Sequence, residues 1–207
     1  MSKPETVTVA GTAAVSAAPD VLRLELGVEA HDITVDQALA DANRAMSAVQ
    51  RALLSSGVRQ SDLRTSNLSI RTEYDRQGRS ISGYVVSQGL DVRLHDVSAA
   101  GGIISAVVST GGDRVRVNGL HFEVSDDAAL LDEARRGAME DARHRAETLA
   151  SVAGRRVGRA LHIREGEPAY PGPVRTRMMA AEAAGSVPLQ AGSHEVSVTV
   201  SVQWALD

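Results

Sequence analysis

The chain of 207 residues is 43% hydrophobic and 23% charged, a balance that is ordinary for a globular protein and excludes an intrinsically disordered one. Its net charge of −4 and its aromatic content of 2% argue against a nucleic-acid-binding protein, which needs a basic surface and aromatic platforms for the bases. No cysteine is present, so disulfides, thiolate nucleophiles and thiolate metal sites are excluded.

The first five residues, Met-Ser-Lys-Pro-Glu, lead directly into a strand pattern, without the charged and apolar regions of a signal peptide. We therefore expect a cytoplasmic protein, or a periplasmic or otherwise extracytoplasmic one if a signal has been removed. No apolar run approaches the roughly 20 residues of a membrane-spanning helix, so no transmembrane segment is expected.

Two strands and a long helix are predicted in the first part of the chain. Apolar residues alternate with polar ones over 7–11 and 22–28, and Pro-Asp at 19–20 predicts a turn between these strands. The residues 34–37, Thr-Val-Asp-Gln, have the spacing of a capping box. Apolar residues then recur at three- and four-residue steps up to Gly57, so a helix with one buried face is expected.

The middle of the chain predicts a hairpin, a short helix and a further strand. Strands over 68–74 and 84–94 flank a turn at 75–79, an arrangement that is typical of a β-hairpin. A weaker helical spacing follows over 97–110. The strand over 115–124 changes phase at an Asn-Gly pair, which indicates a bulge.

A second long helix and two strands complete the predicted elements. Aspartates at 126–127 precede alanines and leucines at mostly four-residue intervals, and Gly154 ends this helix. Strands are expected over 157–163 and 196–206. The order is therefore β-β-α-β-β-(α)-β-α-β-loop-β, an α+β fold with two long helices packed on one side of a mainly antiparallel sheet or sheets. We expect a single domain over residues 1–207.

The segment 166–193 is long and rich in proline and glycine, and loops of this length are usually functional or disordered. A P-x-x-P pattern begins at Pro168 and is of the kind that adaptor domains bind, although a stiff loop explains it more simply. The middle of the segment is basic and then apolar, and methionines suit adaptable contacts. The residues of this possible interaction loop are Tyr170, Arg175, Arg177, Met178 and Met179.

No motif of catalysis or of nucleotide binding is found. The nucleophile elbow, the phosphate loop and the dinucleotide fingerprint are absent, and the six histidines show no metal-ligand spacing. We therefore expect a protein that is not an enzyme, with no catalytic residue, cofactor or metal ligand. Charges of mixed sign on the second long helix predict an ion-paired face. Within the Asn67-Leu68-Ser69 sequon, Leu68 is expected to be a core strand residue.

Taken in order, several segments resemble the SIMPL-domain family, which includes bacterial periplasmic immunogenic proteins and a signalling protein that associates with a pelle-like kinase. The resemblance spans nearly the whole chain. It is carried by the V-x-V-x-G pattern of Val7 to Gly11, Pro19-Asp20, Gly57, Thr65, Gly83-Tyr84, Gly119-Leu120-His121-Phe122, the four-residue alanine series from Ala134 to Ala146, Gly154, Gly158 and the valine-rich last strand.

The resemblance implies an α+β fold and ring-like homo-oligomers, and it brings no established catalytic residues. Some family members are associated with defence against oxidative stress, but this chain has no thiol for such chemistry. Two features depart from the family. Most bacterial relatives carry an export signal or a lipid anchor that is not seen here, and the usual glycine shortly after Gly11 is replaced by Ala13.

Three hypotheses of function follow. The leading one is a non-enzymatic, self-assembling protein whose outward strands and long loop contact further copies, with a link to envelope or stress physiology. The alternative is a small-ligand or metal-binding module that uses the groove beneath the loop at 166–193, with His162 or His194 near its ends. The least supported is a hydrolase with a non-local site, for which the discriminating observation is a cleft holding a serine or an aspartate near a histidine.

Overall fold

A computed structural model describes residues 5–170 and 187–207 of the chain. Seven strands and three α-helices occur within these residues, so the expected α+β class is confirmed. None of the described helices is both long enough and apolar enough to cross a membrane. The elements in chain order are β1 (Thr6–Ala17), β2 (Val21–Asp32), α1 (Val35–Ser55), the 3₁₀ turn η1 (Gln60–Asp62), β3 (Leu63–Tyr74), β4 (Ile81–Leu94), α2 (Ala100–Gly111), η2 (Gly112–Arg114), β5 (Val115–Glu123), α3 (Asp127–Val152), β6 (Val157–Glu165) and β7 (His194–Leu206).

The described residues form two compact units, each with its own antiparallel sheet. We call them the outer unit, made of residues 5–18, 124–170 and 192–207, and the inserted unit, made of residues 19–123 and 187–191. The turn at 19–20 therefore joins two strands, β1 and β2, that belong to different sheets. That these units behave as one domain remains a prediction.

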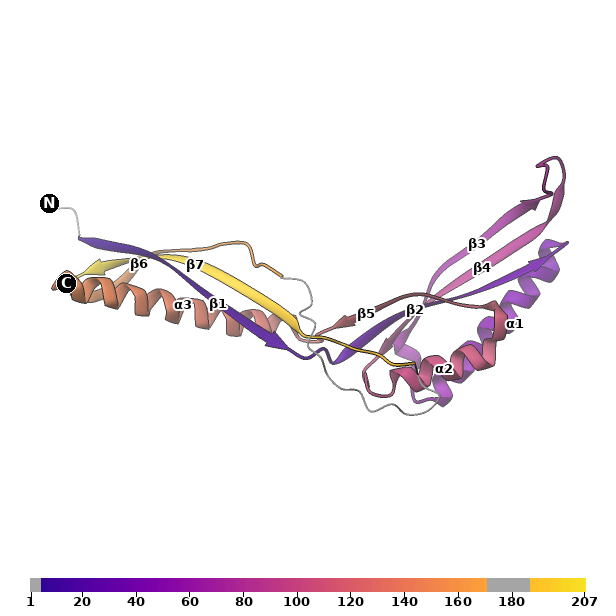
Figure 1. Ribbon diagram of the computed structural model, residues 1–207, viewed down its shortest axis with the longest axis horizontal. Helices are drawn as coiled ribbons and strands as arrows, with labels where there is room; N and C mark the ends of the chain where they lie inside the picture. The colour runs from indigo at the N-terminus through magenta and orange to yellow at the C-terminus, as the bar shows by residue number, and fades with distance from the viewer. Residues whose placement is uncertain (1–4, 171–186) are drawn as a thin grey trace. The chain divides into compact units, whose positions relative to one another are not determined.

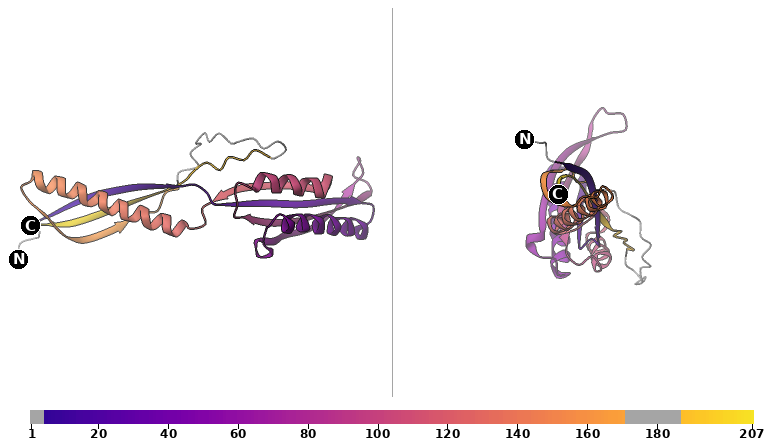
Figure 2. Two further views of the ribbon diagram at one scale, coloured as in Figure 1. Left: turned by 90° about the horizontal axis from the view of Figure 1, so that it is seen from below. Right: turned by 90° about the vertical axis from the view of Figure 1, so that its left-hand side faces the viewer.

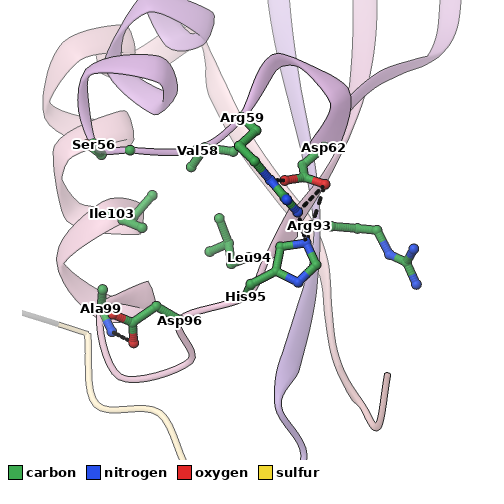
Figure 3. A pocket seen from close by; sticks show the side chains of 11 residues that line it. Ser56, Val58, Arg59, Asp62, Arg93, Leu94, His95, Asp96, Ala99 and Ile103 are labelled. Carbon is green, nitrogen blue, oxygen red and sulfur yellow. Dashed lines mark hydrogen bonds and ion pairs between the residues drawn. The ribbon is translucent and has the colours of Figure 1, made fainter. Parts of the chain in front are cut away.

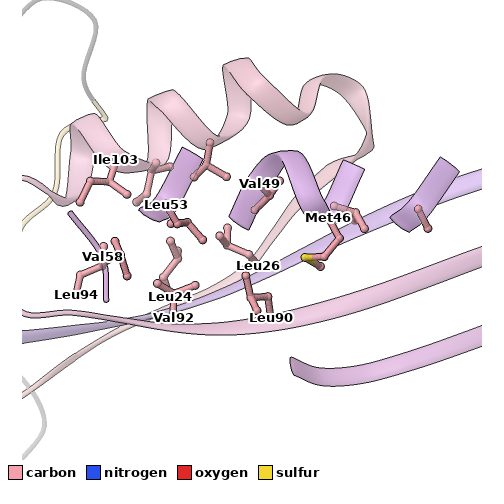
Figure 4. Packing of buried hydrophobic residues seen from close by; sticks show 14 of the residues in the cluster. Leu24, Leu26, Met46, Val49, Leu53, Val58, Leu90, Val92, Leu94 and Ile103 are labelled. Atoms are coloured by element: carbon pink, nitrogen blue, oxygen red, sulfur yellow. The ribbon is translucent and has the colours of Figure 1, made fainter. Parts of the chain in front are cut away.

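The inserted unit is a four-stranded sheet in the order β3-β4-β2-β5, with α1 and α2 on one face (Figure 1). The alternation over 22–28 points leucines and valine toward the helices, whereas the intervening Arg23 and Glu25 lie on the opposite face and stay partly exposed. Figure 4 shows the resulting core, in which aliphatic side chains from the sheet meet those of both helices. The labelled residues are Leu24, Leu26, Met46, Val49, Leu53, Val58, Leu90, Val92, Leu94 and Ile103.

The helix α1 begins and ends where its signals predict. The Thr34 hydroxyl accepts a hydrogen bond from the Gln37 backbone N–H at 3.3 Å, and Gly57 adopts a φ of 89° just beyond the last turn. The reciprocal half of the capping box differs from the expectation. Asp32, rather than the Gln37 side chain, accepts from the Thr34 N–H at 3.2 Å, because a carboxylate two residues upstream already reaches that donor.

The hairpin and the bulge predicted for this unit are both present. Strands β3 and β4 pair antiparallel across a turn in which Gly78 has a φ of 67°. On the other side of the sheet, Glu25 pairs with Gly119 and the next residue, Leu26, pairs with Val117. The extra residue is Asn118, which the change of phase in the sequence indicated.

The outer unit is a three-stranded sheet in the order β1-β7-β6, and α3 packs along β1 and β7 (Figure 2). The four-residue alanine series lies on the buried face of α3, and valines of β7 together with Trp204 lie opposite it. Because small residues line the helix, its backbone approaches the sheet closely. An added Cβ at Gly11 would collide with the backbone of Ala138 and Ala142, so this glycine is required by the packing.

Candidate interaction surface

Only one residue of the possible interaction loop lies within the described part of the chain. Tyr170 is 54% exposed, and its ring centroid lies 6.0 Å from that of His194. Arg175, Arg177, Met178 and Met179 lie outside the described residues. Their role in contacts between molecules therefore stays a prediction.

Neither His162 nor His194, the histidines named for a ligand or metal site, belongs to a cluster of metal ligands among the described residues. His162 is exposed on β6, and His194 begins β7 with its Nε2 3.5 Å from Asp127 Oδ1. That nitrogen is buried and has no hydrogen-bond partner among the described residues. Within residues 5–170 and 187–207, no three His, Asp or Glu side chains are grouped to hold a metal ion.

A histidine beside an aspartate does line a cavity, as the hydrolase hypothesis requires. Asp62 of η1 accepts from Arg59 Nε at 2.7 Å, and its Oδ1 lies 3.3 Å from His95 Nε2. The hydrogen bonds from Arg59, helped by His95, hold the pKa of the Asp62 carboxyl below its usual value despite some burial. The serine that lines the same cavity, Ser56, donates its hydroxyl to the Ala52 carbonyl at 2.9 Å.

The arrangement is therefore an ion cluster rather than a serine triad. In Figure 3, Arg59, Asp62 and His95 point toward one another, while Ser56 lies on the far side of the cavity. A nucleophile needs its base within hydrogen-bond reach, and here the Ser56 hydroxyl is directed to a helix carbonyl. Sequence reasoning missed this cluster because His95, just after β4, lies 33 residues beyond Asp62 in the chain, and only Arg59 and Asp62 of η1 are near each other in sequence.

The edge strand β3 carries exposed apolar side chains on the face that the helices cover elsewhere. Leu68 and Ile70 pair in register with Gln88 and Val86, and Val86 is a core residue. Nevertheless Leu68 is 59% and Ile70 is 49% exposed. The expectation that Leu68 is a core residue is therefore wrong.

The exposure of these residues follows from how α1 is placed. The helix packs on β2 and β4, and a cavity of about 310 Å³ lies between it and β3. Residues of α1 such as Met46 and Gln50 line one side of this cavity, and Leu68 lines the other. Strand β3 thus extends beyond the helix layer. An alternating pattern shows which side chains share a face of the sheet, but it does not show whether a helix covers that face.

Strand β6 repeats the arrangement in the outer unit. Ile163 pairs with Val202, a buried residue opposite α3, but it is 53% exposed because α3 packs mainly on β1 and β7. The neighbouring Leu161 is 38% exposed. We call β3 with Leu68 and Ile70, and β6 with Ile163, the overhanging edges.

The opposite edge of the outer sheet is protected instead. The Thr12 backbone N–H on β1 donates to Asp141 Oδ2 of α3 at 2.8 Å, and this bond, with Arg145, lowers the pKa of the Asp141 carboxyl. A helix carboxylate thus occupies a backbone donor that an added strand would need. Part of the α3 surface is ion-paired as predicted, with Arg143 on Glu147 at 2.9 Å and Arg145 on Asp141 at 2.9 Å, and Arg135 pairs with Glu165 of β6 at 3.0 Å.

Comparisons with known proteins place these features in a family context. A family model described as SIMPL, protein of unknown function (DUF541), matches residues 7–204. The 26 kDa periplasmic immunogenic protein of Brucella melitensis is 32% identical over 218 residues, which cover 97% of this chain and 84% of that protein. The uncharacterized protein YggE of Escherichia coli K12 is 30% identical over 182 residues, which cover 86% of this chain and 72% of that protein.

A more distant match comes from an animal. The interleukin-1 receptor-associated kinase 1-binding protein 1 homolog of Xenopus laevis is 28% identical over 165 residues, covering 78% of this chain and 63% of that protein. The match extends the likeness beyond bacteria.

The expectation of a cytoplasmic protein is wrong. It rested on the lack of a signal-peptide pattern in the first residues, and an absence of that kind does not decide the compartment. The proteins of Brucella melitensis and Brucella abortus that cover 97% of this chain are both named periplasmic, which points to the periplasm.

Proposed function

Because the chain belongs to the SIMPL family, whose molecular function is unknown, we propose that it is a periplasmic protein that acts by self-assembly into a ring-like homo-oligomer rather than by catalysis. The periplasmic names of the Brucella relatives support the compartment. The name of the Xenopus laevis relative, a kinase-binding protein homolog, supports interaction with proteins as the mode of action. The chain has no thiol for redox chemistry. A role in envelope or stress physiology would therefore depend on assembly.

The observation that carries the proposal is the pair of overhanging edges. Leu68, Ile70 and Ile163 lie on the apolar faces of their sheets, yet about half of each side chain is exposed. Burying a fully exposed side chain of this size is worth about 1.5–3 kcal/mol, so covering the exposed half of each is worth roughly half of that. An apolar edge strand left open also invites uncontrolled pairing with other chains, so a specific partner is the physical remedy.

A ring requires two different surfaces on each copy, and the overhanging edges are different. An interface between identical patches closes as a two-fold dimer, whereas contact between unlike patches continues around a ring. We propose that β3 of one copy meets β6 of the next. Each edge then receives the apolar cover that its own helix layer does not supply.

The test is the solution mass of the full chain and of a double variant, Leu68→Lys with Ile70→Lys, by light scattering after size exclusion. Both side chains are exposed, so the variant is expected to fold, and the charges are expected to reduce a large discrete oligomer to monomers. The matched control is Ile33→Lys, which alters a side chain that is 79% exposed but lies outside β3 and β6. It is expected to keep the wild-type mass.

Two outcomes contradict the proposal: a monomeric wild type across a wide concentration range, or a double variant that keeps the full oligomer mass. The contribution of the possible interaction loop is tested separately by replacing residues 171–186 with a Gly-Ser segment of equal length. The replacement stops there because Ala169 bridges Ser197, and Leu189 packs on the core of the inserted unit. Loss of the oligomer in this variant alone would assign the contacts to the loop.

A further inference from the structure

The bulge of β5 places an asparagine and a glycine together at the edge of a sheet. Asn118, the extra residue of the bulge, is followed directly by Gly119. Strand β5 is the last strand of the inserted unit's sheet and pairs with β2 alone (Figure 1). A bulged residue is left out of the ladder of backbone hydrogen bonds, so this pair is held less firmly than its neighbours. Neither residue belongs to the overhanging edges, so the site is independent of the proposed assembly.

The Asn118 side chain lies on the face of the sheet opposite α1 and α2. A Cβ placed on Gly27 would lie 3.1 Å from Asn118 Nδ2, and Gly27 shares its face with Glu25, which those helices do not cover. Asn118 is exposed, and its side chain makes no hydrogen bond within the described part of the chain. Water therefore reaches the side-chain amide, and no described residue ties it down.

An asparagine followed by a glycine can react with its own backbone. The Gly119 nitrogen attacks Asn118 Cγ, and a five-membered succinimide ring forms. The new bond joins that nitrogen to Cγ while the bond from Cγ to Nδ2 breaks, and the departing amide group takes up the proton that the Gly119 nitrogen loses and leaves as ammonia. Because glycine has no Cβ, the approach of its nitrogen and the change of backbone angles are not hindered.

Water then opens the ring at one of its two carbonyl carbons. Addition at Cγ gives aspartate. Addition at the backbone carbonyl carbon of residue 118 gives isoaspartate, in which the main chain continues through Cβ and Cγ. Either product carries a carboxylate where the asparagine was neutral, so the net charge of −4 becomes one unit more negative. The new charge lies on the face that already carries Glu25.

The chain contains two further asparagines, and neither has this arrangement. Asn43 lies in the middle of α1, where backbone N–H groups are bonded within the helix, and its side chain accepts from Gln88 Nε2 at 2.6 Å. Asn67 precedes Leu68, whose branched side chain crowds the attacking nitrogen. We propose that Asn118 is a site of spontaneous deamidation in the folded protein and that the other two asparagines are not.

The experiment incubates the full chain at mildly alkaline pH and follows each asparagine by peptide mapping and mass spectrometry. A sample unfolded in guanidinium chloride is the reference. Conversion at Asn118 in the folded chain is expected to stay within about tenfold of the rate in the unfolded chain, because an exposed bulge at a sheet edge opens locally at little cost in free energy. Asn43 and Asn67 are expected to stay intact in the folded chain over the same time. Both aspartate and isoaspartate are expected at position 118, since direct hydrolysis of the side-chain amide would give aspartate alone.

A variant of the glycine tests the ring-closing step. In Gly119→Ala the added Cβ would lie 3.1 Å from Glu25 Oε2 and 3.3 Å from His121 Nε2. Both atoms are the ends of flexible side chains that can move aside, so the variant is expected to fold. Its conversion is expected to be at least about tenfold slower than that of the wild type. The matched control is Gly102→Ala, where a Cβ meets nothing within 4 Å, and it is expected to keep the wild-type rate at Asn118.

Three results overturn the proposal. The first is a folded chain in which Asn118 reacts more than about tenfold more slowly than in the unfolded chain, since the sheet would then protect it. The second is a product that contains aspartate without isoaspartate. The third is a Gly119→Ala variant that reacts as fast as the wild type.

Discussion

Gly11 and the alanines of α3 show what single small residues decide in this protein. A Cβ at Gly11 would meet the backbone of α3, including the Cα of Ala142 at 2.7 Å. The departure from the family at Ala13 has a partner of its own, since a Cβ at Gly137 would lie 2.8 Å from the Ala13 side chain. A methyl group on the strand is thus matched by a glycine on the helix. The close approach of β1 and α3 requires that, at each contact, only one of the two elements carries a methyl group.

Replacing Gly11 with alanine is expected to destabilise the protein by about 3 kcal/mol, because backbone atoms of the helix cannot yield as a flexible side chain would. The measurement is the denaturant midpoint followed by the fluorescence of Trp204, the only tryptophan. Gly102→Ala is the control, since a Cβ there meets nothing within 4 Å, and alanine in a helix is favoured by up to about 1 kcal/mol. Equal midpoints for Gly11→Ala and the wild type would show that α3 can shift freely.

At the scale of elements, the junction of α1, η1 and β4 is held by the ion cluster of Arg59, Asp62 and His95. The Asp62 side chain is only 11% exposed, and both of its oxygens accept from the Arg59 guanidinium. The short η1 turn therefore has an electrostatic anchor besides its backbone bonds. This anchor lines the cavity between the end of α1, the end of β4 and the start of α2.

The anchor predicts a loss of stability in acid. The pKa of Asp62 is held below the ordinary 3.8 chiefly by the Arg59 hydrogen bonds, so the unfolded chain binds a proton at a higher pH than the folded one. The stabilisation is present above about pH 4 and is lost as the pH falls through the folded-state pKa. Asp62→Asn is expected to be less stable than the wild type at pH 7 but to lose less stability between pH 5 and about pH 3.

Denaturant midpoints at several pH values provide the measurement. The control is Asp113→Asn, an exposed aspartate whose side chain has no partner in the described residues, and it is expected to keep the wild-type dependence on pH. If Asp62→Asn keeps the full wild-type loss of stability in acid, the cluster is not a stabilising anchor.

At the scale of the whole molecule, one unit is inserted into the chain of the other. The Asp20 backbone N–H donates to the Glu123 carbonyl at 3.2 Å, so folding of the inserted unit brings its two ends together. The outer unit continues from those ends as residues 18 and 124. The inserted unit is a long loop between β1 and α3, and its folding brings the ends of that loop together. The entropic cost of pairing β1 with β7 is then lower. We therefore propose that the two units unfold together, as a single domain.

This coupling is tested by a change in one unit that is read in the other. Leu24→Ala, in the core of the inserted unit, is expected to cost about 2–5 kcal/mol and to lower the unfolding midpoint reported by Trp204, which lies in the outer unit. Protein concentration is held fixed, because assembly would add to the stability. Ile33→Ala changes an exposed side chain and is expected to leave the midpoint in place. An unchanged midpoint in Leu24→Ala would mean that the units unfold independently.

The identities of the elements and the limits of the helices were largely predictable from the sequence, because their signals are local, whereas β1 and β3 are longer than the strands expected over 7–11 and 68–74. Thr34 and Gly57 bound α1, the four-residue alanine series marks the buried face of α3, and Asn118 marks the bulge of β5. The α+β class follows from these elements. Residue patterns of this kind depend on neighbours a few positions apart, which is why one sequence was enough to read them.

Only the tertiary structure decided which surfaces are covered and which side chains meet. Leu68 and Leu24 both belong to strands with apolar faces, yet one overhangs α1 and the other lies in the core. Likewise His95 carries no metal-ligand spacing but meets Arg59 and Asp62 across more than thirty residues. Alternation specifies the face of a strand, whereas cover and long-range contact depend on where distant elements pack, and that is a property of the folded chain alone.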